Sequence, residues 1–426
     1  MNVAGTLRNI WEEKNLRRKI LVTLVILLVF RFISHIPAAG IDLLALRRLF
    51  AGSPLLSLLD VFSGGTLANF SVMALGLNPY INASIIFQLL GVVFPQIEEM
   101  ARESEAGREK LNQYTRWLTV PLSAMQAVGV YLLLRGQGVV GNLGPLSLLA
   151  LLLTMVTGTI LAMWLGELIS EYGVGNGISV LIFAAIIGRL PVVLSQTAVT
   201  AGGGELVSLA VIGLLAVAVI LAVVAVNEAV REIPVQYARR ARGGEQVAAR
   251  SHLPIRLNQA GVIPIIFAVS LVLLPSMVSQ FLSGVGNATV VEWAQRISGY
   301  FRPGSLVYSG VYFLLVVGFT FFYTTVVFNP EKIADDLKKQ GGFVPGIRPG
   351  MATQEYLSYV SSRITVVGAV FLGLVAVLPS LMQEATEIAA LALGGTGVLI
   401  VVSVILETAK QVEAQLVMRS YERFLG

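Results

Sequence analysis

The sequence predicts an all-α polytopic membrane protein with ten transmembrane helices, and three observations lead to this fold class. Hydrophobic residues make up 55% of the 426 residues, charged residues only 13%, and the mean hydropathy is +0.78. Soluble domains have a very different balance. The apolar residues gather into runs close to the roughly 20 residues that a helix needs to cross a bilayer. Most of the 30 Lys and Arg lie in alternate gaps between these runs.

The runs predict ten spans, whose limits are 20–36, 71–94, 117–134, 146–168, 178–193, 206–226, 260–282, 306–328, 364–382 and 394–417. The basic residues concentrate before the first span and after spans two, six, eight and ten. By the positive-inside rule these segments are cytoplasmic, and an even number of spans then places both termini in the cytoplasm. The charged amphipathic segment 1–19 runs directly into a full-length span, so we expect no cleavable signal peptide.

The stretch 60–95 joins two features that are unusual together in a membrane protein. Residues 60–70 are polar and rich in glycine, which does not suit a lipid-facing helix. The span that follows is interrupted near its beginning by Asn78-Pro79. Irregular backbone persists at membrane depth only where protein buries it or water reaches it, so this junction predicts a cavity or a pore. The mixed-charge run 96–116 that follows is typical of a solvated loop.

Spans one to five and six to ten form two halves, residues 1–200 and 201–426. An odd number of spans in each half inverts the second half relative to the first, and inverted repeats place the working site at the midplane between them. Two isoleucine pairs are candidates for its wall: Ile81 and Ile85, and Ile178 and Ile182. Each pair shares one helix face, one after the Asn78-Pro79 interruption and the other after the glycine-rich turn 173–177, which we expect to need positive φ angles.

Two long cytoplasmic loops carry features of interaction surfaces. Loop 227–258 contains six arginines and no lysine, a preference that suits phosphate or carboxylate partners as well as membrane orientation. In loop 329–363, Ile333 and Leu337 share one face of a short amphipathic helix. The turn 345–350 after it presents Arg348 at a rigid tip, which favours docking of a partner.

Several function classes are disfavoured by the residues themselves. The chain has no cysteine and two distant histidines, so neither a metal centre nor a cofactor is expected. Ser179 has no neighbouring base, which argues against a hydrolase, and no phosphate-binding loop is complete. A secondary transporter is the main alternative to a channel, but it needs charged or strongly polar residues at the midplane. The intramembrane Arg31 of span one is expected either to face the bundle interior or to extend to an interface.

Six ordered motifs carry a resemblance to a known family over almost the whole chain. They are FSGG at 62–65, ALGLNPYINASIIFQLL at 74–90, GNGIS at 175–179, HLPIRLNQAGVIP at 252–264, FNPEKIADDLKKQGGFVPGIRPG at 328–350 and GGTGVLIVV at 394–402. With these motifs the chain resembles the SecY/Sec61-alpha family, the central channel subunit of the Sec protein translocon. The resemblance implies a channel that is not an enzyme. It would pass unfolded secretory polypeptides across the bacterial inner membrane and release transmembrane segments sideways into the bilayer.

The resemblance also implies a site. The two halves would enclose an hourglass pore with a waist of six isoleucines, namely Ile81, Ile85, Ile178, Ile182, Ile266 and Ile400. A plug at about 60–70 would close it, formed by Asp60, Phe62, Ser63, Gly64, Gly65, Thr66 and Asn69. Spans two and seven would form a lateral gate with Gln88 and Asn258 in its polar lining. Arg239, Arg240 and Arg348 would dock partners.

The partners that the resemblance implies are the small membrane subunits SecE and SecG, the motor ATPase SecA, the ribosome, substrate polypeptides with signal sequences and the surrounding lipid. Two positions depart from the family pattern. Gly91 stands where a threonine is common in the polar cluster of the gate, and the tail after Ser420 is short. Physically, branched aliphatic side chains resist wetting in a narrow pore, so such a ring can exclude ions and still spread around an extended chain.

Overall fold

The computed structural model describes residues 13–38, 46, 48, 65–67, 69–103, 105–136, 138–140, 143–200, 206–237, 249–282, 288–301, 305–386 and 389–425. Ten helices of 16 residues or more lie within these ranges, and each overlaps one predicted span. They are α2 (Lys14–Ile33), α5 (Asn78–Val93), α7 (Glu105–Gly136), α8 (Pro145–Tyr172), α9 (Gly177–Thr200), α10 (Leu206–Glu228), α11 (Ile263–Leu282), α13 (Leu306–Val327), α15 (Met351–Thr386) and α16 (Ala389–Leu425).

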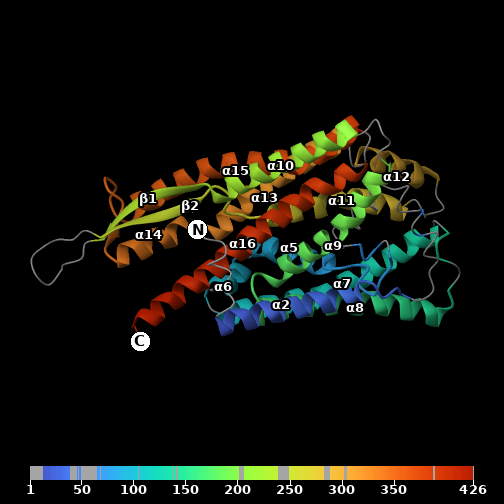
Figure 1. Cartoon of the computed structure of the whole chain (residues 1–426), viewed down its shortest axis with the longest axis horizontal. Helices are drawn as coiled ribbons and strands as arrows, with labels where there is room; N and C mark the ends of the chain where they lie inside the picture. Colours follow the sequence, from blue (N-terminus) through green and yellow to red (C-terminus); the bar gives the residue numbers. More distant parts are fainter. Residues whose placement is uncertain are drawn as a thin grey trace, which may run out of the picture.

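The long helices run side by side along the longest axis of the molecule (Figure 1). By length and composition, four helical stretches within the described residues could cross a membrane: Ala106–Gly136, Pro145–Tyr172, Leu306–Lys339 and Met351–Leu381. Shorter apolar helical stretches are found at Gly177–Gly188, Val217–Glu228 and Ile263–Ser276. The molecule therefore has the long, apolar helices with roughly aligned axes that are typical of a polytopic membrane protein.

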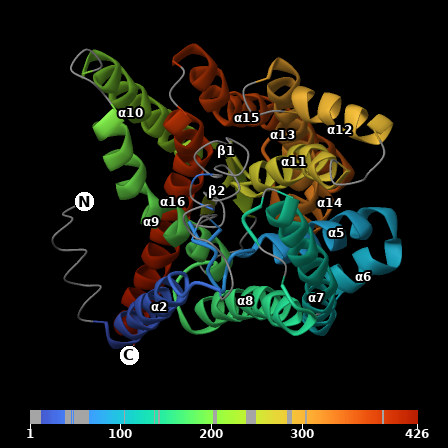
Figure 2. The ribbon, with the colours of Figure 1, turned by 90° about the vertical axis from the view of Figure 1, so that its right-hand side faces the viewer.

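The view along the bundle shows how the two parts of the chain are arranged (Figure 2). The helices α2, α7 and α8 lie on one side, and α11, α13 and α15 lie on the opposite side. Between them, α9 packs against both α8 and α16, while α5 packs against α7 and also touches α11. The interior is thus surrounded by helices that come from both the first and the second half of the sequence.

A small β-sheet stands at one end of the bundle, where the sequence analysis predicted only a long loop. Strands β1 (Val230–Tyr237) and β2 (Ala249–Arg256) form an antiparallel hairpin, and β3 (Gly342–Phe343) pairs with the other edge of β1. Ile233 and Val235 are buried on β1, which is the period-two pattern of a strand with one covered face. Ile233 packs with Ile255 and Leu357, so the hairpin is fixed to the start of α15.

The predicted amphipathic helix in loop 329–363 is confirmed as α14 (Pro330–Lys339). The side chain of Asn329 caps it by accepting a hydrogen bond from the backbone N–H of Lys332 at 3.0 Å. Leu337 is buried, and Gly341 follows the helix with a φ of 71°. The hairpin and α14 project together from the end of the bundle where α2 begins and α16 ends (Figure 1).

Two sequence expectations about the region around span two were wrong. The predicted solvated loop 96–116 is helical in its described residues, because α6 (Pro95–Glu103) and the first turns of α7 occupy it. The Asn78-Pro79 pair does not interrupt a helix but begins one, since Pro79 lies in the first turn of α5 and residues 72–77 form turns. Proline suits a first helical turn because the N–H it lacks would have no partner there.

Candidate pore and its seal

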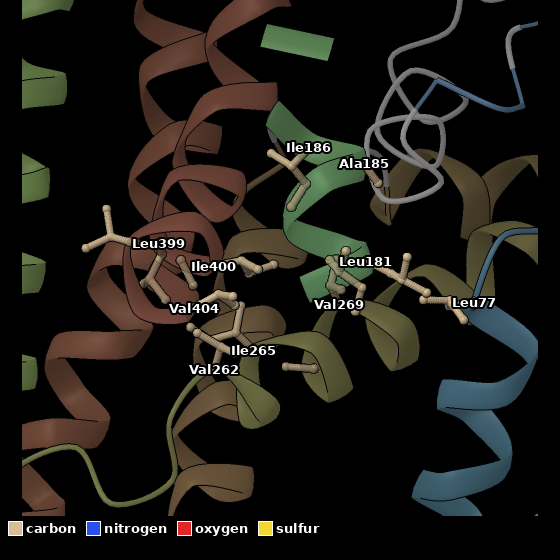
Figure 3. Packing of buried hydrophobic residues seen from close by; sticks show 14 of the residues in the cluster. Leu77, Leu181, Ala185, Ile186, Val262, Ile265, Val269, Leu399, Ile400 and Val404 are labelled. Atoms are coloured by element: carbon tan, nitrogen blue, oxygen red, sulfur yellow. The ribbon is translucent and has the colours of Figure 1, made fainter. Parts of the chain in front are cut away.

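Five of the six predicted ring isoleucines meet in one hydrophobic cluster. Ile182 on α9 and Ile400 on α16 are buried, at 5% and 0% exposure, and Ile81, Ile178 and Ile266 pack against the same cluster in partly buried positions. The sixth, Ile85, is also buried, at 6% exposure, but lies outside this cluster. Figure 3 shows side chains of α9, α11 and α16 directed toward a shared interior.

Three of these isoleucines border one cavity of about 90 Å³, which we call the aliphatic cavity. It lies between α5, α7, α9 and α11, and its wall includes Ile81, Ile182, Ile266 and Leu67. The amide side chains of Asn78, Asn82 and Gln126 also reach it. The cavity therefore combines a wall of mainly branched aliphatic side chains with a residue of the segment that was predicted to be the plug. Such a narrow apolar space disfavours continuous water.

Only part of the predicted plug lies within the residues that the structure describes. Gly65, Thr66 and Asn69 lie in described positions, whereas Asp60, Phe62, Ser63 and Gly64 lie outside the described residues. Thr66 is buried, and Gly65 has a φ of 83°, a left-handed conformation that favours glycine. The backbone carbonyl of Thr66 accepts a hydrogen bond from the N–H of Ser71 at 2.8 Å. This end of the segment is therefore an ordered set of turns.

The same turns are attached to the end of α2. The N–H of Ala38 donates to the carbonyl of Phe70 at 2.8 Å, and the N–H of Val72 donates to the carbonyl of Ile36 at 3.0 Å. Phe70 and Leu67 are buried in a second hydrophobic cluster with Met155 of α8. The segment that leads into α5 is thus held both by backbone hydrogen bonds and by side-chain packing.

Gly158 on α8 permits this packing, and the sequence analysis did not identify it. A Cβ atom at Gly158 would lie 1.9 Å from the carbonyl oxygen of Val72, so any side chain there would clash with backbone. Gly158 is buried, and the backbone of the turns before α5 approaches it more closely than a side chain would allow. A glycine inside an apolar span was the available signal, although its partner is 86 positions away in the sequence.

The glycine-rich turn between α8 and α9 positions Ile178 and Ile182. Only Gly175 needs a positive φ, at 88°, whereas Gly177 is required because a Cβ atom there would lie 1.8 Å from the carbonyl oxygen of Gly166. The Asn176 side-chain oxygen accepts from the N–H groups of Ile178 at 3.2 Å and Ser179 at 3.3 Å. These bonds cap the start of α9 and so fix where its isoleucines enter the interior.

The two predicted gate residues do not bond to one another. Gln88 donates from Nε2 to the Ser84 hydroxyl at 3.1 Å, within α5 itself. Asn258, just before α11, donates from Nδ2 to Asn227 Oδ1 at 2.8 Å, and Asn227 donates in turn to the Ser403 hydroxyl at 3.0 Å. Asn258 therefore connects the start of α11 to α10 and α16. This network was not predicted from the sequence.

A second cavity, of about 200 Å³, lies beside this network, and we call it the hairpin-end cavity. Asn176, Asn227, Asn258, Gln259, Glu407 and Lys410 are among its lining residues. Among the described residues, Asn258 Oδ1 and both amide atoms of Gln259 are buried without a hydrogen-bond partner. Buried amide groups need water or another polar group, so this cavity suits polar contents. The ion pair between Lys410 Nζ and Glu228 Oε1, at 2.8 Å, adds charge close by.

Arg31, in the last turn of α2, contacts another helix of the bundle. Its Nη2 atom donates to the carbonyl oxygen of Gly188 at 2.8 Å, and a Cβ atom at Gly188 would lie within 2.6 Å of the guanidinium. The contact joins α2 to the middle of α9. A charged residue within a span is thereby used to hold the helix that carries Ile178 and Ile182.

Of the three arginines predicted to dock partners, Arg348 is the one that the structure describes. Arg348 is exposed in the turn after β3, where Gly346 and Gly350 have φ angles of 83° and 103°. Its carbonyl oxygen accepts from the Thr353 hydroxyl at 2.9 Å, which fixes the turn against the start of α15. Arg239 and Arg240 lie outside the described residues. Within the described part of the chain, no group of three His, Cys, Asp or Glu residues could hold a metal ion.

Comparison with known proteins decides the family. The SecY family model matches residues 71–409. The chain is 42% identical to the protein translocase subunit SecY of Mycobacterium bovis, over 96% of this chain and 97% of that protein. This chain belongs to the SecY family. Another SecY protein, from Halalkalibacterium halodurans, is 43% identical over 99% of both chains. The resemblance stated from the motifs is confirmed.

Solved structures confirm the fold class. A structure described as a protein-conducting channel superposes with a TM-score of 0.65 at 20% identity, covering 94% of this chain and 93% of that one. Sec61 in a canine ribosome-channel complex from the endoplasmic reticulum superposes with a TM-score of 0.63 at 19% identity and the same coverage. The chain therefore has the all-α membrane fold that SecY and Sec61 share, and the ten long helices are consistent with it.

Proposed function

We propose that this chain is a protein-conducting channel. It passes unfolded secretory polypeptides across the membrane and releases transmembrane segments sideways into the bilayer. The observation that carries the proposal is the aliphatic cavity, where isoleucines from α5, α9 and α11 meet Leu67 of the segment before α5. Relatives at 42–43% identity are protein translocase subunits, and similar structures are protein-conducting channels.

The proposed seal works because its side chains do not select their substrate by hydrogen bonds. A channel for polypeptides meets every kind of side chain, so aliphatic groups that adhere to none of them suit the narrow point. When the passage is narrow, the same groups exclude continuous water and the ions it carries. The ring would consist of Ile81, Ile85, Ile178, Ile182, Ile266 and Ile400. The plug would be the segment at about 60–70, supported at its end by the backbone bonds to the end of α2.

Sideways release follows from the same arrangement. The helices α5 and α11 border the aliphatic cavity from opposite halves, and we propose that the seam between them is the lateral gate. Gln88 on α5 and Asn258 before α11 would belong to its polar lining. A segment of about 20 apolar residues gains several tenths of a kcal/mol per Leu or Ile in lipid, so an open seam lets it partition into the bilayer. The halves 1–200 and 201–426 would move relative to one another at this seam.

We infer that partners supply the energy and the substrate, because the sequence offers no complete nucleotide-binding loop. SecA, the ribosome, SecE and SecG are the proposed partners. Structures with this fold include complexes with ribosomes. The exposed Arg348 turn beside the β-hairpin supports a docking role for that end, together with Arg239 and Arg240 of the hairpin loop.

We also propose the orientation and location of the chain. The Lys and Arg residues concentrate in the N-terminal segment through the first turns of α2, in α6 and the first turns of α7, between α10 and α11, and between α13 and the start of α15. The positive-inside rule then places the hairpin, α14 and both termini in the cytoplasm of a bacterium, with the chain as a multi-pass protein of the plasma membrane. The common position of the hairpin, α14, the start of α2 and the end of α16 supports this orientation (Figure 1).

Site-specific crosslinking tests the proposed path directly. The chain has no cysteine, so a single cysteine at Ile182 or Ile266 can be placed without other changes. With a translocating polypeptide stalled in the membrane, both positions are expected to crosslink to it. A cysteine at Leu221, which is exposed on the outer side of α10, is the matched control and is expected not to react. Absence of a crosslink at both interior positions would contradict the path.

A further inference from the structure

A short helix at the far end of the bundle has three distinct faces. Helix α12 (Ala288–Tyr300) connects α11 to α13 at the end opposite the β-hairpin (Figure 1). Ala294 on this helix is fully buried, and Val290 and Ser298 on the same side are half-buried. The helix packs against α11. Its inner face is therefore occupied by the protein itself.

A second face of α12 is apolar but exposed. Trp293, Ile297 and Tyr300 follow one another at intervals of four and three residues, so they lie along one flank of the helix. Their exposed fractions are 61%, 38% and 62%. Two of the three are aromatic residues with one polar group each. This is an uncommon composition for a flank in contact with water.

The third face is polar and carries no net charge. Glu292, Gln295 and Arg296 are all exposed on the side away from α11. Arg296 Nη2 lies 2.7 Å from Glu292 Oε1, and its guanidinium carbon lies 5.8 Å from the centre of the Trp293 ring. The arginine thus stands at the border between the polar and the aromatic faces, held by an ion pair and a cation–π contact.

The neighbouring part of α13 also exposes apolar side chains. Leu306 and Val307, in the first turn of α13, have exposed fractions of 75% and 43%. In a membrane protein, such residues at the end of a span mark the surface that lipid covers. The aromatic flank of α12 is therefore followed in the chain by an exposed apolar start of a span.

We propose that α12 is an interfacial helix that lies in the lipid headgroup region of the leaflet opposite the β-hairpin. Trp293, Ile297 and Tyr300 insert between lipids, and Glu292, Gln295 and Arg296 face water. Trp and Tyr suit this depth because their rings are apolar while their N–H and O–H groups still reach polar partners. An amphipathic helix in this position buries its apolar face about 5–10 Å into the boundary between headgroups and acyl chains.

Helix α12 carries no net charge, so its insertion is expected not to depend on anionic lipids. Interfacial helices rich in Lys and Arg depend on anionic lipids, whereas here the ion pair cancels the only two charges of the helix. The insertion depth of Trp293 is therefore expected to be the same in zwitterionic vesicles and in vesicles with anionic lipids. Because α12 packs on α11, it also holds the outer end of α11 at a fixed depth in the membrane.

Fluorescence of Trp293 tests this placement. The chain has four tryptophans, and replacing Trp11, Trp117 and Trp164 by phenylalanine leaves Trp293 as the single reporter. The variant is reconstituted alone in phosphatidylcholine vesicles. Three quenchers are compared: lipids brominated near the headgroup, lipids brominated near the chain end, and acrylamide in the water. Bromine near the headgroup is expected to quench most strongly, with weak quenching by acrylamide.

The matched control moves the reporter by two residues. In the same background, Trp293→Phe together with Gln295→Trp places a tryptophan on the polar face. This reporter is expected to be quenched by acrylamide and little by brominated lipid. Equal acrylamide quenching at both positions would overturn the proposal, since the flank would then be in water. Strongest quenching from the chain end would also overturn it, and so would shielding of Trp293 from all three quenchers, which means a protein covers the flank.

A nitroxide label gives a second measurement that keeps the other tryptophans. A single cysteine replaces Ile297, and in a separate variant Gln295, in the otherwise unchanged chain. The label at position 297 is expected to collide more with oxygen, which concentrates in lipid, than with a water-soluble nickel complex, and the label at 295 is expected to show the reverse. The same preference at both positions would contradict the proposal. None of these measurements depends on channel activity.

Discussion

The aliphatic cavity and the hairpin-end cavity differ in the side chains that line them. The first, of about 90 Å³, is enclosed mainly by isoleucine, leucine, valine and alanine side chains from both halves of the chain. The second, of about 200 Å³, is lined by asparagine, glutamine and charged side chains together with valine, isoleucine and leucine, and it contains amide groups without protein partners. The first space is thus the less favourable of the two for water, and the unpaired amide groups of the second need water or another polar partner.

Under the proposed function, the difference assigns control of permeability to the aliphatic cavity. A polypeptide that enters from the hairpin end would first meet a polar space that can keep its backbone hydrated. It would then meet a short apolar region where ions lose their hydration. A barrier of this kind can be short, because the cost of removing water from an ion is large even over a small distance. In this proposal the hairpin-end cavity is the vestibule, and the aliphatic cavity is the seal.

The largest effect on stability is expected from Gly158→Ala, where α8 packs against the turns that lead into α5. The new Cβ atom would lie 1.9 Å from the Val72 carbonyl oxygen, so the backbone before α5 must shift. Overpacking of this kind typically costs about 1–3 kcal/mol. The melting temperature of the purified chain is expected to fall by several degrees, as followed by circular dichroism. Gly318→Ala is the control, because nothing lies within 4 Å of a Cβ atom there. Equal melting temperatures for both variants would exclude the close packing at Gly158.

A smaller effect is expected in the vestibule, from Asn258→Ala. The substitution removes the donor to Asn227 and disconnects the start of α11 from α10 and α16. Leaving a buried polar group without its partner costs about 1–3 kcal/mol, but here the adjacent cavity can admit water to replace the bond. We therefore expect a loss near the lower end of this range in thermal unfolding. A loss at the upper end of this range would mean that water does not replace the lost hydrogen bond.

The smallest effect is expected from Lys410→Ala, also in the vestibule. The ion pair with Glu228 is partly exposed, with side-chain exposures of 30% and 49%. Partly exposed pairs contribute at most about 1 kcal/mol and are weakened by salt. The change in melting temperature is expected to be slight and to diminish as the salt concentration is raised. A large loss that is insensitive to salt would show that the pair is shielded from solvent, against the polar character of this region.

Much of the fold follows from local patterns. The ten long helices were predictable because each span is an apolar run, and α14 was predictable from Ile333 and Leu337 on one face. The β-hairpin was not predicted, although Ile233 and Val235 alternate with Glu232, Pro234 and Gln236. Its many arginines are also typical of a charged loop, and the residues of β3 that pair with β1 lie 105 and 107 positions further along the chain.

The site was predictable in part for the same reason. The isoleucine pairs stand next to visible local signals, a proline at a helix start and a glycine-rich turn. The contacts that hold them are long-range: Gly158 against Val72, Arg31 against Gly188, and Asn258 with Asn227 and Ser403. The residue type at each of these positions does not indicate which distant residue it contacts. The composition of a single segment therefore indicates which residues line an interior, but not what fixes them there.

The central claim is that aliphatic side chains, rather than the polar network, stop ions in the resting channel. It is tested most directly by the ion conductance of the purified chain in planar lipid bilayers, with the double variant Ile182→Ala and Ile266→Ala. Leu214→Ala with Leu221→Ala, on the exposed side of α10, is the control. The account predicts a resting ion current several-fold above that of the unchanged chain for the first pair and no change for the second. An unchanged resting current with the isoleucine pair replaced, in folded protein, would contradict it.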